Sequence, residues 1–402
     1  MNPQDIVIVA ARRTPIGAFQ GALAPLSAPE LSAAATRACL ADSGLAADEV
    51  DHAIIGCVLQ AGLGQAPARQ AALAGGLTQA TDCLTVNKVC GSAMKAATIG
   101  YDMLRAGAAR YVLAGGMESM SNAPYLLPKA RAGYRMGHQQ VLDHMFFDGL
   151  QNPYDGQMMG YFAEQTARHY GFTREQQDAF AIASVERALA ATASGAFEAE
   201  IAPVTVASRR GESVVRQDEE PARCDIGRIP VLRPAFAKGG TVTAASSSSI
   251  ADGAASLLLT TAAEANARQL PVLARIAGYS THSQAPEWFT TAPVGALRKL
   301  QERLGWSAGD VDLYEINEAF ACVTMAAMRE LDIDHARINV NGGACALGHP
   351  IGATGARIIV TLLHALQDRG GRRGIAALCI GGGEALAIAL DLNDLPNSAT
   401  AP

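Results

Sequence analysis

Short apolar runs rich in β-branched residues alternate along the chain with longer segments that have apolar residues at helical spacing. Residues 6–10 predict a strand, residues 29–43 predict a helix, and Gly44 is placed to end that helix. Further elements are predicted as a strand at 50–56, a helix at 65–74 and a strand at 111–116. Since strands and helices alternate, we predict an α/β fold with a parallel sheet.

The last third of the chain repeats this plan, with a predicted strand at 313–316. The matching pairs are 48–51 with 309–312, Gly44 with Gly305, and 114–118 with 380–384. The general similarity of strand–helix units would also produce such matches. The common offsets favour two half-chains of one design.

Residues 119–249 interrupt the alternation of strands and helices. Prolines, an irregular stretch at 133–148 and a charged segment at 208–228 replace it, and the clearest order is a helix at 174–192 with Thr173 as its N-cap. Because loops on a rigid scaffold often carry function, we interpret this segment as an inserted lid or binding lobe.

The composition narrows the class of protein. Of 402 residues, 49% are hydrophobic, 5% are aromatic and 40 are glycine, which favours tightly packed α/β layers. A chain of this length can form two or three lobes around large cores. The net charge of -6, without a basic stripe, argues against nucleic acid or a membrane surface as a partner.

Features of targeting and of metal binding are not evident in the sequence. The first strand follows Met1 closely, without a charged region and a long apolar run, and no uncharged apolar run is long enough to cross a bilayer. The eight cysteines include no C-x-x-C pair, so we expect reduced thiols, without disulfides or a metal site. These features predict a cytoplasmic protein.

The segment 85–97 carries the first candidate for chemistry. An apolar approach ends at Cys90, Gly91 and Ser92 follow, and small helix-forming residues continue, which predicts strand, tight turn and helix. A cysteine at the start of a helix faces backbone N–H groups and the positive end of the helix dipole, which stabilise a thiolate. Cys90 is therefore a candidate nucleophile, and the alternative is a small buried core residue.

Three further segments place reactive side chains at strand ends or at loop-to-helix turns. His349 stands between a glycine and a proline, where a neutral imidazole could take the proton of a nearby thiol. Cys379 could move a carbon-bound proton, and the N–H groups near Gly381 could hold an oxyanion. Asn317 could position a water. Each also has a structural explanation, as a loop histidine, a core thiol or a turn residue.

Taken together, these segments resemble the thiolase family over almost the whole chain. The matching motifs occur in the family's order: Asn-Lys-Val-Cys-Gly-Ser at 87–92, Gly-Met-Glu-Ser-Met-Ser at 116–121, Met-Gly at 159–160, Asp-Gly-Ala-Ala at 252–255, Asn-Glu-Ala-Phe at 317–320, Gly-His-Pro-Ile-Gly at 348–352 and Cys-Ile-Gly-Gly-Gly at 379–383. Any one of them is a weak signal, whereas all of them in order are specific.

The resemblance implies the thiolase fold, an α/β structure with five layers in the order αβαβα, built from two similar halves with an inserted loop domain. We place the N-terminal half at 1–120 plus 250–272, the inserted CoA-binding lobe at 121–249 and the C-terminal half at 273–402. The same likeness implies a homotetramer, assembled as a dimer of dimers.

The resemblance also implies a ping-pong Claisen condensation of two acetyl-CoA molecules, which gives acetoacetyl-CoA and CoA, and the reverse thiolysis. In that reaction Cys90 is acylated, His349 activates it, and Cys379 removes or returns the α-proton. One thioester oxygen is held by His349 and a water on Asn317, and the other by the N–H groups of Cys90 and Gly381. CoA and acetyl-CoA are substrates, and no cofactor or metal is implied.

The likeness further assigns residues to coenzyme A. The positions that match the pantetheine channel are Leu150, Met159, Ser248, Ala319 and Phe320. Arg223 is assigned to the nucleotide end. The chain departs from the family pattern at Ala93, Met158 and 245–249, and since two of these sites border the channel, the preferred acyl-chain length stays open.

We therefore expect acetyl-CoA C-acetyltransferase activity, with a 3-ketoacyl-CoA thiolase of broader chain length as the nearest alternative. A condensing enzyme of the ketoacyl-synthase type shares the nucleophilic cysteine but uses a second histidine, whereas this chain has Asn317 and Cys379. A non-catalytic CoA-binding or redox-sensing thiol protein is the alternative from another class, and it would transfer no acyl group.

Overall fold

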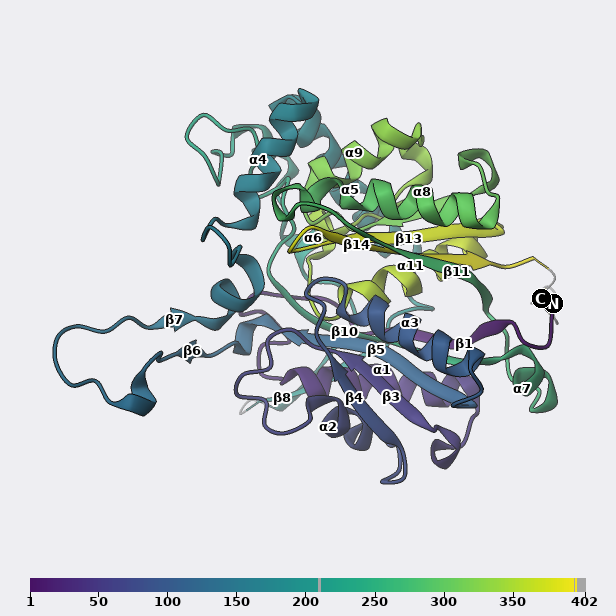
Figure 1. Ribbon diagram of the computed structural model, residues 1–402. Helices are drawn as coiled ribbons and strands as arrows, with labels where there is room; N and C mark the ends of the chain where they lie inside the picture. The colour runs from purple at the N-terminus through teal and green to yellow at the C-terminus, as the bar shows by residue number, and fades with distance from the viewer. Residues whose placement is uncertain (209–210, 394, 396–402) are drawn as a thin grey trace.

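Two β-sheets and three layers of helices form the body of the molecule in the computed structural model, which describes residues 1–208, 211–393 and 395 (Figure 1). The first half consists of β1 (Ile6–Arg13), β2 (Gly17–Ala18), α1 (Ala28–Ser43), β3 (His52–Gly56), α2 (Pro67–Ala74), β4 (Asp82–Val86), α3 (Ser92–Arg105), β5 (Tyr111–Ser119), β10 (Ala251–Thr261) and α7 (Ala262–Ala267). The second half consists of β11 (Ala274–Ser283), α8 (Ala292–Leu304), β12 (Leu313–Ile316), α9 (Ala321–Leu331), α10 (Ala344–Leu347), α11 (Thr354–Arg369), β13 (Arg373–Ile380) and β14 (Glu384–Asp391).

The two halves share one topology. The strands are hydrogen-bonded in one continuous order, which divides into two parts that we call the first and the second sheet. The first has the order β4-β3-β5-β10-β1, with β2 paired to β10, and the second has the order β12-β13-β14-β11. In the second half, a parallel bridge pairs Tyr314 of β12 with Ile338. Ile338 thus lies beside β12 as β4 lies beside β3. The predicted duplication is thereby confirmed. The edge strands β1 and β11 join the sheets through the antiparallel pairs Val7 with Arg275 and Ile8 with Ala274.

The prediction of a parallel sheet is only partly right. Strands β3, β4 and β5 are parallel to one another, as are β12 and β13. However, β10 runs antiparallel to both β5 and β1, and β14 runs antiparallel to both β13 and β11. The reason is that strand direction depends on partners distant in sequence, which local alternation of elements does not report.

The layers follow the order αβαβα that the sequence predicts. Helices α1 and α2 cover one face of the first sheet, α8 and α9 cover the outer face of the second, and α3 and α11 lie between the sheets (Figure 1). The largest apolar core is formed by α3, α11 and the inner faces of both sheets. Gly355 of α11 allows the two central helices to touch, since a Cβ there would lie 2.4 Å from the Met94 backbone nitrogen.

The segment between β5 and β10 leaves the layers. It contains β6 (Tyr125–Leu126), β7 (Leu142–Asp143), α4 (Met159–Tyr170), α5 (Arg174–Ser194), β8 (Val204–Ser208), β9 (Gly211–Val215) and α6 (Glu220–Arg223). Strands β6 and β7 form an arm that projects from the body (Figure 1). The predicted helix at 174–192 is confirmed, and Thr173 caps it, because its side chain accepts a hydrogen bond from the Gln176 N–H.

Candidate active site

Cys90 lies in the turn between β4 and α3, as the sequence predicts. The Ser92 hydroxyl holds this turn, because it accepts from the Lys88 N–H at 2.9 Å and donates to the Val89 carbonyl at 2.7 Å. Val89 has a φ of 46°, which is rare for a β-branched residue, so the backbone just before the thiol is strained. Gly91 lets the turn approach the second half, since a Cβ there would lie 2.4 Å from Ile380.

The protonation state of Cys90 depends on two opposing effects. Burial raises the pKa of the thiol to about 11, although the N–H groups of Gly381 and of Cys90 itself act in the opposite direction. The backbone donors favour the thiolate, as the sequence predicts, but desolvation outweighs them. At neutral pH the thiol keeps its proton and needs a base to remove it.

His349 lies just before the other central helix. Its ring nitrogen Nδ1 is 2.6 Å from the Thr354 hydroxyl, and its Nε2 is buried with no hydrogen-bond partner among the described residues. Burial lowers the pKa of the imidazole to about 3, and the positive charge of Arg357 acts in the same direction. The ring is therefore neutral at pH 7 and has the protonation state that a general base requires.

Cys379 and Asn317 are both buried, and Cys379 is close enough to Cys90 for its own pKa to be affected. Cys379 is the second-to-last residue of β13 and has no exposed surface. Burial raises the pKa of its thiol well above the ordinary value, and Cys90 and Cys322 raise it further. Asn317 follows β12, and neither its Oδ1 nor its Nδ2 has a partner among the described residues. A buried amide without a partner offers hydrogen bonds to a water or to a substrate.

One apolar cavity of about 210 Å³ brings most of the predicted site together. Cys90, His349 and Gly381 line it. All five positions assigned to the pantetheine channel line it as well, namely Leu150, Met159, Ser248, Ala319 and Phe320. The wall is completed mainly by other apolar side chains, which is typical of a pocket that orients its ligand through a few polar groups.

Three of the predicted site residues do not line this cavity. Cys379 and Asn317 are buried and are not among the lining residues. Arg223 is at the end of α6 and forms an ion pair with Glu219, with 3.1 Å between Nη1 and Oε1. Its contact with a nucleotide remains a prediction.

Two buried carboxylates near the site received no role in the sequence analysis. Glu118 accepts hydrogen bonds from the N–H groups of Val58, Leu59 and Gly352, and so ties the loop after His349 to the loop after β3. Burial raises its pKa to about 7. The motif that contains it was recognised, but only the fold shows which N–H groups it binds.

Glu318, the second of these carboxylates, directly follows Asn317 in the sequence. It accepts from the Ser184 hydroxyl at 2.7 Å, from Asn339 Nδ2 at 2.7 Å and from the Cys345 N–H at 3.1 Å. These bonds join the loop after β12 to α5 of the insertion and to the glycine-rich loop that leads to His349. The only indication in the sequence that Glu318 helps to build the site is its position directly after Asn317.

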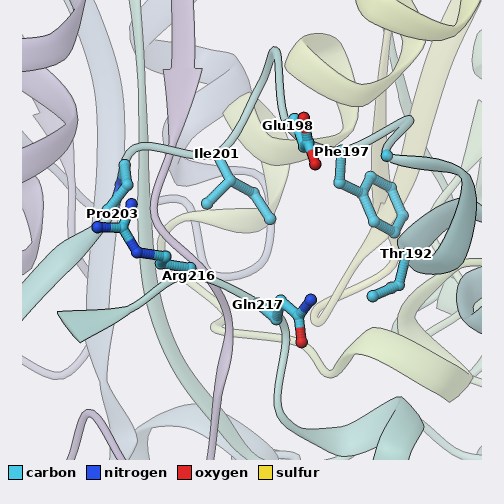
Figure 2. A pocket seen from close by; sticks show the side chains of 8 residues that line it. Thr192, Phe197, Glu198, Ile201, Pro203, Arg216 and Gln217 are labelled. Atoms are coloured by element: carbon cyan, nitrogen blue, oxygen red, sulfur yellow. The ribbon is translucent and has the colours of Figure 1, made fainter. Parts of the chain in front are cut away.

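A second cavity, of about 340 Å³, has a different set of lining residues (Figure 2). It is lined by Thr192, Gly195, Phe197, Glu198, Ile201, Pro203, Arg216 and Gln217. None of the predicted catalytic or coenzyme A positions is among them. The chemistry predicted from the sequence therefore belongs to the cavity at Cys90.

The described residues contain neither a metal-ligating cluster nor a membrane-spanning helix. Within residues 1–208, 211–393 and 395, no group of three or more His, Cys, Asp or Glu side chains is arranged to hold a metal ion. In the same part of the chain, no helix is both long enough and apolar enough to cross a membrane.

Two matching α/β halves bring a thiol and a neutral imidazole to one apolar cavity. These features fit an acyltransferase, the class that comparison with known families shows. Residues 6–263 match the thiolase N-terminal domain and residues 270–392 match the thiolase C-terminal domain. The chain belongs to the thiolase family.

Individual relatives match over nearly the full length. An acetyl-CoA acetyltransferase of Pseudomonas aeruginosa is 51% identical over 389 residues, which cover 96% of this chain and 99% of that protein. The solved structure of Acat5 thiolase from Ascaris suum in complex with coenzyme A has a TM-score of 0.91 at 42% identity, covering 96% of this chain and 99% of that one. The structure of the Bacillus anthracis acetyl-CoA acetyltransferase has a TM-score of 0.94 at 41% identity, with 96% and 98% covered.

Proposed function

We propose that this chain is an acetyl-CoA C-acetyltransferase, which condenses two acetyl-CoA molecules to acetoacetyl-CoA and CoA and catalyses the reverse thiolysis. The observation that carries the proposal is the single apolar cavity that joins Cys90, His349 and Gly381 to the five pantetheine positions. Relatives named acetyl-CoA acetyltransferase, at 51% identity in Pseudomonas aeruginosa and 48% in Escherichia coli, support it.

The first half-reaction acylates Cys90. His349 Nε2 takes the thiol proton while the sulfur attacks the thioester carbonyl carbon of acetyl-CoA, and the developing oxyanion is held by donors that are already in place. The C–S bond to coenzyme A then breaks, and the leaving thiolate takes the proton from Nε2. A thioester replaces a thioester, so the step needs little net energy.

The second half-reaction forms the carbon–carbon bond. His349 Nε2 takes the proton of the Cys379 thiol, and the resulting thiolate removes a proton from the methyl group of a second acetyl-CoA. The carbanion attacks the acetyl carbonyl carbon on Cys90, the C–S bond to Cys90 breaks, and the Cys90 thiolate takes the proton from His349 Nε2 as acetoacetyl-CoA leaves. While Nε2 carries the proton, His349 and a water on Asn317 donate to the enolate oxygen, and the N–H groups of Cys90 and Gly381 hold the tetrahedral oxyanion. The N–H groups of these two residues already lie against the Cys90 sulfur.

Coenzyme A and acetyl-CoA are the substrates in this proposal, and the two cysteines and the histidine supply the chemistry without a further cofactor. The insertion at 121–249 acts as the CoA-binding lobe between halves at 1–120 plus 250–272 and 273–402. Arg223, although paired with Glu219, would reach the nucleotide end. The enzyme would be cytoplasmic.

A homotetramer is also part of the proposal. The arm formed by β6 and β7 supports it, because several large apolar side chains there are exposed, with Tyr125 at 68% and Met136 at 90%. Exposed apolar groups on a projecting arm are a surface that a second copy of the chain would cover.

The second candidate is a 3-ketoacyl-CoA thiolase that accepts longer acyl chains. The apolar wall of the cavity would accommodate an alkyl chain, and one relative, from Staphylococcus aureus, is named a probable acetyl-CoA acyltransferase at 45% identity. A series of 3-ketoacyl-CoA substrates, from acetoacetyl-CoA upward, cleaved by free CoA separates the two candidates. Activity restricted to acetoacetyl-CoA supports the acetyltransferase, and comparable rates on long chains support the broader thiolase.

The control for this series is the Cys90→Ala variant. Loss of activity on every substrate in that variant ties the cleavage to the proposed site. Absence of activity in the unmodified chain, on all chain lengths and in both directions, would overturn both candidates.

A further inference from the structure

His349 can act as a base only if its proton is on Nδ1, because Nε2 must then carry the free lone pair. We propose that Thr354 is the residue that positions this ring and fixes its tautomer for the acylation of Cys90. This inference rests on the proposed acyl transfer and adds to it a residue that does not itself touch the substrate.

The hydrogen bonds of the Thr354 hydroxyl carry the argument. Its oxygen lies 2.6 Å from His349 Nδ1 and donates to the Pro350 carbonyl at 3.0 Å. A hydroxyl has one proton to donate, so once that proton is directed at Pro350, the oxygen is left as an acceptor for the ring. In the hydrogen bond between His349 and Thr354, the donor must then be the Nδ1–H group of the ring.

The opposite tautomer is less favourable in these surroundings. A proton on Nε2 would be a buried donor with no acceptor among the described residues, since that atom has no hydrogen-bond partner there. The hydroxyl would also have to turn away from the Pro350 carbonyl to donate to Nδ1. With the proton on Nδ1, the free lone pair is on Nε2, and His349 lines the same cavity as Cys90.

A neutral hydroxyl, such as that of Thr354, can orient the imidazole of His349 without favouring its charged form. In many enzymes a carboxylate holds the second nitrogen of a catalytic histidine and favours the charged imidazolium. Here Glu118, the buried carboxylate that binds the loop after His349, accepts from the N–H groups of Val58, Leu59 and Gly352. Thr354 supplies direction without negative charge.

The backbone holds Thr354 firmly in place. It is the first residue of α11, it is fully buried, and its N–H donates to the Pro350 carbonyl at 3.0 Å. The next residue, Gly355, packs against Met94 in the central layer. The position of the hydroxyl is thus set by the contact between the two central helices.

The experiment compares the rate of acylation by acetyl-CoA in a single turnover, followed by the mass of the peptide that contains Cys90. Thr354→Val removes the hydroxyl and keeps the shape, whereas Thr354→Ser keeps the hydroxyl. Thr361→Val is the matched control, because Thr361 is a buried threonine two turns further along α11 and donates to Glu200. Circular dichroism and the KM for acetyl-CoA are measured for each variant.

We expect Thr354→Val to slow acylation about 100-fold, within the range that general-base catalysis contributes, with little change in KM. Thr354→Ser and Thr361→Val should acylate at nearly the rate of the unmodified chain. If Thr354→Val does not fold, the pair Thr354→Ser and Thr354→Ala gives the same comparison, since both lack the methyl group and only serine keeps the hydroxyl.

Three results would overturn the inference. Acylation of Thr354→Val at the normal rate or faster would mean that the hydroxyl does not favour the tautomer needed for catalysis. A Thr354→Ser variant as slow as Thr354→Val would assign the effect to the methyl group, and equal losses in Thr361→Val would assign it to the stability of α11. If the unmodified chain is not acylated on Cys90 at all, the proposed function itself fails.

Discussion

Cys90 and His349 are both neutral at pH 7, because burial raises the pKa of the thiol to about 11 and lowers the pKa of the imidazole to about 3. A thiolate and imidazolium pair would be costly in this desolvated cavity before the substrate arrives. The thiol of Cys90 therefore transfers its proton to His349 Nε2 while its sulfur forms the bond to the thioester carbon.

The pH dependence of thiol reactivity follows from the raised pKa of Cys90. Below about 11 the thiolate fraction grows about tenfold for each unit of pH, so alkylation of Cys90 by iodoacetamide should still be accelerating between pH 7 and pH 9. Mapping the modified peptide separates Cys90 from the other thiols. A rate that levels off at or below pH 8 would show instead that the start of α3 stabilises the thiolate, as the sequence had suggested.

Replacement of Cys379 separates the two half-reactions. Cys379→Ala should still be acylated on Cys90 but should lose condensation and thiolysis by about 100-fold or more, because it lacks the group that moves the α-proton. The matched control is Cys322→Ala, a buried thiol that packs in the same apolar cluster as Cys379. Normal turnover by Cys379→Ala would remove its assigned role.

At the scale of single elements, the best predicted features are those with local causes. The helix expected at 29–43 is observed at Ala28–Ser43, and Gly44 and Gly305 end α1 and α8 in the left-handed conformation, with φ of 67° and 65°. Caps and turn glycines act within a few residues, so the sequence reports them directly.

The N-cap of α5 allows a quantitative test of such local effects. Thr173→Ala removes the acceptor for the Gln176 N–H and one side of a capping box, so it should lower the free energy of unfolding by about 1 kcal/mol. The change is measured as a shift in the denaturant midpoint. Thr173→Ser retains the hydroxyl and should restore most of the stability, and an alanine variant as stable as the serine variant would show that the cap contributes nothing.

Features with distant causes were not predicted. The antiparallel direction of β10 and β14 depends on strands far away in sequence. The roles of Glu118, Glu318 and Thr354 depend on which loops the fold brings together, and the state of Cys90 depends on how much water the cavity excludes. A motif can indicate the type of side chain, whereas desolvation and pairing arise only in the folded chain.

At the scale of the whole molecule, the duplicated halves explain where the site lies. The two central helices, α3 and α11, have equivalent places in their halves, and Cys90 and His349 lie in the loops that lead into them. Close packing of these helices brings the two loops to one cavity, although the residues are far apart in sequence. The thiolase family and its five layers, both predicted from motifs, are confirmed by the family matches and by the solved relatives.

The most direct test of the account is the location of the acetyl group after the purified chain is mixed with acetyl-CoA and quenched in acid. We predict one acetyl group, on the peptide that contains Cys90, which free CoA removes and which Cys90→Ala lacks while remaining folded. An acetyl group that persists in Cys90→Ala, or that maps to another residue of the unmodified chain, would contradict the central claim that Cys90 carries the acyl group.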